Sequence, residues 1–255
     1  MNRCKDEIII GRNAVLAALK AGRPAVSLLV TAAAGKSLPH IIRECKDRKI
    51  PIKEVERAKL DEMSEMAVHQ GVILLAAAAS YSQLEDILDL AKERDEPPFV
   101  IICDGIEDPH NLGAIVRTAE AVGAHGVIIP ARRSAGLTTA MAKAASGALE
   151  YIPVCRVTNI SQTIDTLKTH GLWIYGAAVG GQVWHKADLL GPAAVVIGSE
   201  GKGMSALVEK KCDALVSIPM AGQITSLNAS VAAGIIMFEI RRQRDNGSGE
   251  LIVDS

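Results

Sequence analysis

From Phe99 onward, short apolar runs alternate with stretches of helical periodicity, and this alternation constrains the fold more than any other feature. The runs have the length of strands and contain few polar residues; they are 99–104, 126–130, 151–157, 172–179, 193–198 and 214–218. Strands of this kind suit a parallel sheet that helices cover on both faces. Residues 98–255 are therefore predicted to be an α/β domain that binds ligands at the carboxyl ends of its strands.

Residues 1–76 show a separate and smaller α/β pattern, within the usual size range of a domain. Strands are expected at 8–10, 26–31, 51–55 and 71–77, and helices at 11–22, 38–49 and 60–66. The acidic segment 77–97, which ends before Pro98, is predicted to be an interdomain linker with a helical turn or two.

Charge and composition limit the classes of protein. The net charge is −1, but residues 1–76 carry 13 Lys and Arg against 9 Asp and Glu, so this part could face a polyanion. No apolar run reaches the ~20 residues that span a bilayer, and the first ten residues resemble no secretion signal. The five cysteines contain no CxxC pair, so neither a disulfide framework nor a zinc site is expected. The predicted compartment is the cytosol.

The stretch 218–240 joins a strand to a long apolar helix. The strand closes at Pro219, and a helix is expected from about Ser226, because Leu227, Val231, Ile235 and Phe238 recur at three- and four-residue steps. Ser226, Asn228 and Ser230 would then crowd its first turn, where unpaired N–H groups make the end positive. A capping cluster is the simpler interpretation. Three polar side chains exceed what one cap needs, which favours a site.

Two other strand ends carry unusual residues. After Asp104, a turn leads into a helix that Asn111 is well placed to cap, and Arg117 lies under two turns further along. Arg117 could share a site with Asn111 or be a surface cation, and His110 is more readily a turn residue than a base. His69 and His185 have no partner at a useful spacing.

The other strand end is VVIGSEGKGMS, residues 195–205. Its glycines permit close approach of the backbone to a ligand. The Walker spacing and the Rossmann fingerprint are both absent. Because Glu200 would repel phosphate, a neutral or cationic ligand suits this loop better. The three strand ends offer no cysteine nucleophile and no metal cluster.

Together these residues resemble a known family. DPHNLGAIVRTAEAVG, VIGSEGKGMS and IPMAGQITSLNASVA are similar, in order and spacing, to the three motifs of the SpoU (TrmH) family of RNA ribose 2′-O-methyltransferases, in the SPOUT class. Residues 1–76 resemble the family's L30-like substrate-binding domain. The likeness covers nearly the whole chain, and it is strongest to the bacterial enzymes that methylate a guanosine of 23S ribosomal RNA.

The resemblance implies a deep C-terminal trefoil knot, an exception to the general absence of knots. It also implies a homodimer and S-adenosylmethionine held in the knot by main-chain groups, without a metal. The matching catalytic residues are Asn111, Arg117, Glu200, Ser226 and Asn228. The matching cofactor-binding residues are Gly198, Ile218 and Leu227, with the loop after Tyr175 nearby.

The chemistry requires a ribose hydroxyl aligned with an activated methyl group. Because a guanidinium is not deprotonated in proteins, Arg117 is interpreted as a phosphate clamp that also stabilises the forming alkoxide. The proton would pass to the adjacent phosphate, to Glu200 or to water. The alternatives are a transfer RNA ribose methyltransferase and a non-catalytic RNA-binding ribosome assembly factor; a nicotinamide dehydrogenase lacks its fingerprint.

Overall fold

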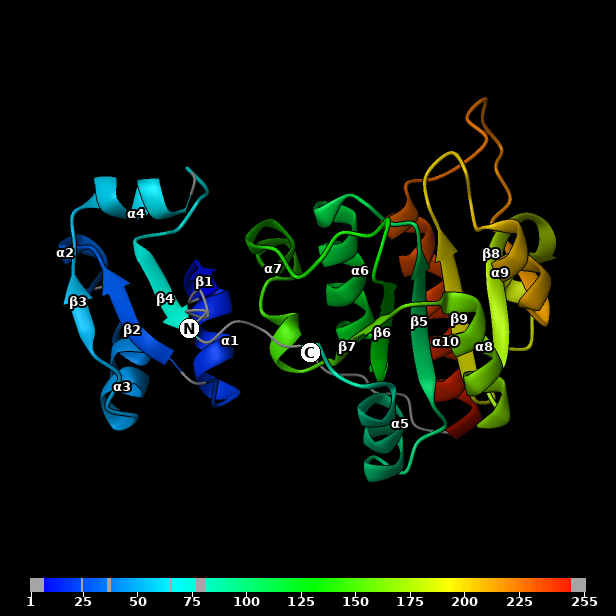
Figure 1. Ribbon diagram of the computed structural model, residues 1–255, viewed down its shortest axis with the longest axis horizontal. Helices are drawn as coiled ribbons and strands as arrows, with labels where there is room; N and C mark the ends of the chain where they lie inside the picture. The colour runs from blue at the N-terminus through cyan, green and yellow to red at the C-terminus, as the bar shows by residue number, and fades with distance from the viewer. Residues whose placement is uncertain (1–6, 24, 36–37, 65, 77–80, 249–255) are drawn as a thin grey trace. The chain divides into compact units, whose positions relative to one another are not determined.

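Figure 1 shows a computed structural model of the chain, which describes residues 7–23, 25–35, 38–64, 66–76 and 81–248. The chain divides into two compact units, residues 1–80 with 137–151, and residues 81–136 with 152–255. Within the described residues, no helix has both the length and the apolar character needed to cross a membrane.

The first unit is built on a four-stranded sheet in the order β1-β4-β2-β3. β4 runs antiparallel to β1 and β2, whereas β3 runs parallel to β2. All four predicted strands are confirmed. The elements are β1 (Glu7–Ile10), α1 (Arg12–Lys20), β2 (Ala25–Val30), α2 (Ala32–Gly35), α3 (Pro39–Asp47), β3 (Ile52–Glu54), α4 (Arg57–Met63) and β4 (Val72–Ala76).

This sheet buries side chains on both of its faces. Leu28 and Leu74 pack on one face with Leu19 of α1. Their chain neighbours Leu29 and Ile73 pack on the other face with α4, because successive side chains of a strand point to opposite sides. The unbroken apolar runs of these strands follow from this two-sided burial.

His69 has a structural role in the first unit, and the expectation that it lacks a partner is wrong. Its Nδ1 accepts the Gly71 N–H at 3.0 Å, and its Nε2 lies 2.9 Å from Asp61 Oδ1. Since Nδ1 accepts, Nε2 carries the proton and donates to Asp61 in the neutral ring. The ring is 4% exposed, so the two bonds fix the chain between α4 and β4.

The segment 137–151 packs with the first unit, whereas the sequence assigns it to the second domain. It contains α7 (Thr139–Ala145) and the 3-10 turn η1 (Ala148–Glu150). Gly147, with φ +95°, lies so close to α1 that a Cβ would be 2.6 Å from Ala17 Cβ. Arg23 pairs with Glu150 at 2.5 Å, and both side chains are about nine-tenths buried.

The second unit contains a six-stranded sheet in the order β10-β8-β9-β5-β6-β7, and every pair of neighbours is parallel. The predicted parallel sheet is therefore confirmed; the knot stays a prediction. The strands are β5 (Phe99–Asp104), β6 (Gly126–Pro130), β7 (Val154–Val157), β8 (Trp173–Val183), β9 (Ala193–Gly198) and β10 (Ala214–Ser217). The remaining elements are α5 (Leu84–Glu93), α6 (Pro109–Ala121), α8 (Ile160–Thr169), the 3-10 turn η2 (Trp184–Lys186), α9 (Ala206–Lys211) and α10 (Ala229–Ser248).

Helices cover both faces of this sheet. Val100 and Ile102 of β5 pack on one face with Ile87 of α5 and Ile164 of α8. On the other face α6 and α10 pack against each other and against the sheet (Figure 1). The two-sided cover explains why Ile101, between two residues of the first face, is also fully buried.

The described part of the predicted linker is a helix of the second unit. α5 begins with a capping box between Gln83 and Asp86, and Ile87 and Ala91 are fully buried. A Cβ on Gly126 would lie 2.4 Å from Ile87 Cγ1, so the helix sits tightly on β6. The acidic residues that suggested a linker belong to the solvent side of an amphipathic helix.

Candidate active site

The candidate site lies at the carboxyl ends of β5 and β9, in the middle of the six-stranded sheet. Asp104 at the end of β5 is paired in register with Gly198 at the end of β9. From β5 the sheet continues through β6 and β7 on one side, and through β9, β8 and β10 on the other. Open α/β sheets bind ligands at the carboxyl edge where the strand order reverses in this way.

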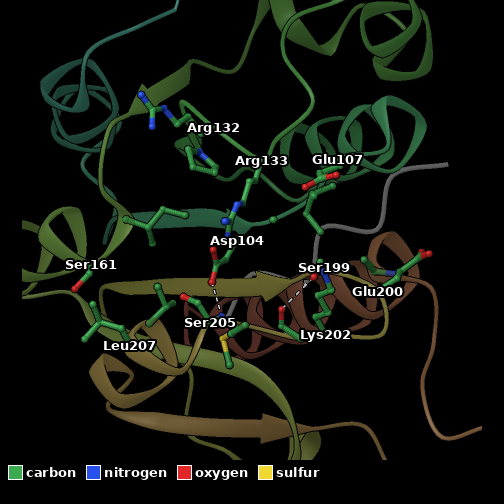
Figure 2. A pocket seen from close by; sticks show the side chains of 18 of the residues that line it. Asp104, Glu107, Arg132, Arg133, Ser161, Ser199, Glu200, Lys202, Ser205 and Leu207 are labelled. Atoms are coloured by element: carbon green, nitrogen blue, oxygen red, sulfur yellow. Dashed lines mark hydrogen bonds between the residues drawn. The ribbon is translucent and has the colours of Figure 1, made fainter.

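The loop after β9, residues 199–205, folds back on itself and is called the glycine loop below. Ser199 and Gly203 exchange two main-chain hydrogen bonds of 3.0 and 2.9 Å, and Gly203 has φ +67°. Asp104 Oδ2 accepts the Ser205 N–H at 2.7 Å, which ties the loop to β5 (Figure 2). The loop is therefore a fixed part of the site.

One side chain from each of the three sequence motifs joins a hydrogen-bonded network. Asn111 Nδ2 donates to Glu200 Oε1 at 3.0 Å. Asn228 Nδ2 donates to the same oxygen at 2.6 Å and to Asn111 Oδ1 at 2.9 Å. The Ala229 N–H also approaches Glu200 Oε1, at 3.3 Å. The carboxylate thus links the glycine loop to the starts of α6 and α10.

The helix that follows the third motif begins at Ala229 rather than near Ser226. Asn228 Oδ1 accepts the N–H groups of Ser230 and Val231 at 2.9 and 3.3 Å, so Asn228 caps α10 and Ser226 precedes it. Asn228 therefore has two functions, because its oxygen caps the helix while its Nδ2 holds Glu200. The capping interpretation is therefore confirmed for Asn228, while its place in a catalytic site stays a prediction.

The start of α6 also differs from the expectation. Its N-cap is Asp108, whose Oδ1 accepts the His110 N–H at 2.9 Å, and Pro109 is the first helical residue. Asn111 is therefore not the cap; it lies in the first turn, and its side chain is free to reach Glu200. His110 is the second residue of α6, and its main-chain N–H is bound by Asp108; the role of its side chain stays a prediction.

A cavity of about 500 Å³, called cavity A, lies beside the glycine loop. The three residues predicted to bind the cofactor, Gly198, Ile218 and Leu227, all line it, together with Ser226. A Cβ on Gly198 would lie 2.3 Å from the Gly203 carbonyl carbon, so only glycine fits where the backbone of β9 meets its loop. The main chain of the glycine loop therefore packs directly against the end of β9.

The segment after Tyr175 also lines cavity A, but as part of strand β8 rather than as a loop. Ala177, Ala178 and Val179 supply small side chains there, and Gly181 leaves room for the main chain of β10, since a Cβ on it would lie 2.4 Å from Leu215. The segment therefore lines the same cavity as Gly198, Ile218 and Leu227, and the expected loop is wrong because the segment is a strand.

Arg117 lies apart from this network. Its side chain is exposed on α6, it does not line cavity A, and within the described part of the chain it forms no hydrogen bond or ion pair. The structure therefore brings together Asn111, Glu200 and Asn228, with Ser226 on the wall of cavity A, but it does not add Arg117 to them.

A second cavity of about 930 Å³, called cavity B, adjoins cavity A across the glycine loop. Figure 2 shows it between the carboxyl ends of β5 and β6 and the loop. Three basic residues line it, Arg132, Arg133 and Lys202. This cavity was not predicted from the sequence, although an arginine pair directly after the strand that ends at Pro130 was a usable signal.

The cysteines of the second unit are poor nucleophiles. Burial raises the pKa of Cys103 to about 12, and it raises the pKa values of Cys155 and Cys212 to about 11. The thiolate is the reactive form of cysteine, so these side chains remain inert thiols near neutral pH. Among the described residues, no group of three or more His, Cys, Asp and Glu could hold a metal ion.

This parallel sheet, with a glycine loop and an Asn–Glu–Asn network at its switch point, matches a known family. The model of the SpoU rRNA Methylase family matches residues 98–238. A second model, RNA 2′-O ribose methyltransferase substrate binding, matches residues 8–82. The chain belongs to the SpoU rRNA methylase family, a class of RNA methyltransferases.

Relatives and solved structures agree with this membership. The chain is 48% identical to YacO of Bacillus subtilis, assigned to the TrmH family of tRNA/rRNA methyltransferases, over 94% of this chain and 97% of YacO. It is 46% identical to a TrmH family protein of Staphylococcus aureus, over 94% and 97%. The SpoU methyltransferase AviRb from Streptomyces viridochromogenes, solved with AdoMet, superimposes with a TM-score of 0.81 at 26% identity, over 96% of this chain and 93% of AviRb.

Proposed function

We propose that the protein transfers a methyl group from S-adenosylmethionine to the ribose 2′-hydroxyl of a guanosine in 23S ribosomal RNA, in the cytosol and without a metal. The observation that carries this proposal is the network of Asn111, Glu200 and Asn228. It joins one residue of each family motif at the boundary between cavity A and cavity B. The choice of 23S RNA and of guanosine rests on the overall sequence resemblance.

Cavity A fits S-adenosylmethionine on three grounds. Gly198 lines the cavity without a side chain, and main-chain groups can bind an adenine edge. Ile218 and Leu227 offer apolar surface to the ring. Glu200 and Glu209 also line the cavity, and carboxylates offset the positive charges of a sulfonium and an amino group. When bound, the cofactor supplies an activated, electrophilic methyl group.

The protein's own contribution is to align the ribose hydroxyl and to stabilise the charge that develops on it. Alignment can supply up to ~7–11 kcal/mol of the barrier. Glu200 Oε1 already accepts bonds from three donors, so we assign Glu200 to positioning, and the proton to the adjacent RNA phosphate or to water. Arg117, exposed and without a described partner, suits a planar clamp on phosphate.

A homodimer built by the second unit is part of the proposal, and so is the family's trefoil knot. Ala233, Ile236 and Met237 of α10 are buried in the chain. On another side of the same helix Val231 is 50% exposed and Phe238 is 55% exposed. Apolar residues at i and i+7 share one face of a helix, so this face is suited to pack against a second copy.

We expect Phe238→Glu to convert the dimer to a monomer, because a carboxylate would have to be buried unpaired in the interface. Sedimentation velocity of the full chain at micromolar concentration measures this. Val26→Glu, which changes an equally exposed valine of the first unit, should leave the dimer intact. A wild-type monomer, or a dimer that tolerates Phe238→Glu, contradicts this choice of interface.

The function is tested by mapping ribose methylation in total RNA from a strain that lacks the gene. The proposal expects the loss of a single 2′-O-methylguanosine in 23S RNA, restored by the wild-type gene. Loss of a mark in transfer RNA instead would assign the enzyme to the other RNA class. An unchanged methylation map would favour a non-catalytic assembly factor.

A further inference from the structure

Cavity B has a marked asymmetry between its acidic and basic residues. Four acids line it, of which Asp104 accepts the Ser205 N–H, Asp108 accepts the His110 N–H and Glu200 accepts three donors. The fourth, Glu107, makes no hydrogen bond or ion pair within the described residues, and neither do the bases Arg132, Arg133 and Lys202. Three of the four carboxylates are thus engaged by N–H donors, whereas all three cations remain available to a ligand.

The loop that carries the two arginines is fixed at both ends. The Ala131 N–H donates to Val157 O at 2.7 Å, and the Ala135 N–H donates to Ile106 O at 2.8 Å. Between these anchors Arg133 adopts φ +57°, a conformation that is uncommon outside glycine and asparagine. Figure 2 shows the Arg133 side chain directed into the cavity towards the end of β5, whereas Arg132 extends away from it.

The first turn of α8 adds to the positive character of the cavity. Asn159 and Ser161 line cavity B, and Asn159 caps the helix by accepting the Gln162 N–H at 3.2 Å. A ten-residue helix carries partial positive charge at this end. Together with Arg133 and Lys202, it makes an environment for a ligand with more than one negative charge.

We propose that cavity B receives the RNA strand at the methylated nucleotide, with Arg133 and Lys202 binding its phosphates. This inference rests on the proposed function. The volume of about 930 Å³ lies at the upper end of the range for small-ligand sites, which suits a nucleotide with its flanking phosphates. Because Asn111 and Glu200 also line cavity B, a strand held there brings a ribose next to the network and cavity A.

RNA is favoured over a small anion because the cavity shares a wall with the cofactor site. The shared residues are Ser199, Glu200, Lys202, Gly203, Met204 and Ala229. A nucleotide extruded from its stack can reach such a pocket, as in other enzymes that modify single nucleotides. A phosphate on each side of the ribose gives Arg133 and Lys202 separate anionic groups to bind.

The test compares Arg133→Ala with Arg132→Ala in the full chain, using 23S RNA transcribed in vitro as the probe. We expect Arg133→Ala to weaken RNA binding on the order of tenfold and to lower the slope of log affinity against log salt by about one. Arg132→Ala, the outward-pointing neighbour, should have a smaller effect on both. Arg133→Lys should recover most of the affinity, since phosphate also accepts a point charge.

Two further readouts separate this inference from the proposed function. Titration with S-adenosylmethionine should be unchanged in Arg133→Ala, because Arg133 does not line cavity A. Methyl transfer by the wild-type chain reports on the proposed function alone. If the wild type methylates the transcript while Arg133→Ala keeps wild-type RNA affinity and salt slope, the cavity proposal is overturned and the enzyme assignment stands. A wild-type chain that neither binds nor methylates the transcript overturns both.

Discussion

Arg117→Ala is expected to lower the rate of methyl transfer by roughly a hundredfold or more, as happens when one preorganised charge-stabilising donor is lost. The substitution removes an exposed side chain without a described partner, so the fold should be unaffected. S-adenosylmethionine affinity should also persist, because Arg117 lines neither cavity. The measurement is single-turnover methylation at saturating RNA and cofactor, which isolates the chemical step from binding.

Two matched variants sharpen this prediction. Arg117→Lys keeps the charge but loses the planar fork, and it should therefore recover little of the rate. Lys186→Ala removes another exposed cation of the same unit that lines neither cavity, and it should behave like the wild type. A wild-type single-turnover rate in Arg117→Ala would remove Arg117 from the chemistry.

The comparison of Arg117 with Asn111 shows what the sequence can predict about a site. The parallel sheet brings Asn111, Glu200 and Asn228 to one edge, because each lies a fixed number of residues from the end of a strand or helix. Arg117 is also at a fixed offset on α6, but whether it faces that edge depends on the rotation of the helix on the sheet. The spacing of the two residues predicted that Arg117 could reach Asn111. The structure of a single chain shows no such contact between their side chains.

The elements that were predicted well are those whose signal is local. Strands β5, β6 and β9 match their expected bounds because each is an apolar run buried on both faces. The predicted start of α10, near Ser226, precedes the observed start at Ala229. The helix begins where the Asn228 side chain caps it, and apolar periodicity contains no information about that hydrogen bond.

The larger errors in the predicted domain organisation concern packing between residues that are far apart in the sequence. The sequence of α5 suggested a linker because Glu85, Asp86, Asp89 and Glu93 are acidic, yet Ile87 is fully buried against Gly126, almost forty residues later. Residues 137–151 lie between two strands of the second unit but pack with the first, through contacts such as Gly147 with Ala17. Neither partner can be identified from local periodicity.

Gly198→Ala is expected to raise the Kd for S-adenosylmethionine on the order of tenfold, since overpacking costs ~1–3 kcal/mol and 1.4 kcal/mol is tenfold. The new Cβ would lie 2.3 Å from the Gly203 carbonyl carbon and the Met204 nitrogen, main-chain atoms that cannot rotate away. The glycine loop must then move, and Glu200 moves with it. Gly191→Ala, where no atom lies within 4 Å of the new Cβ, is the control. Calorimetric titration in EDTA measures both variants and also tests the metal-free proposal. Wild-type affinity in Gly198→Ala would mean that the main chain at this point does not shape the cofactor site.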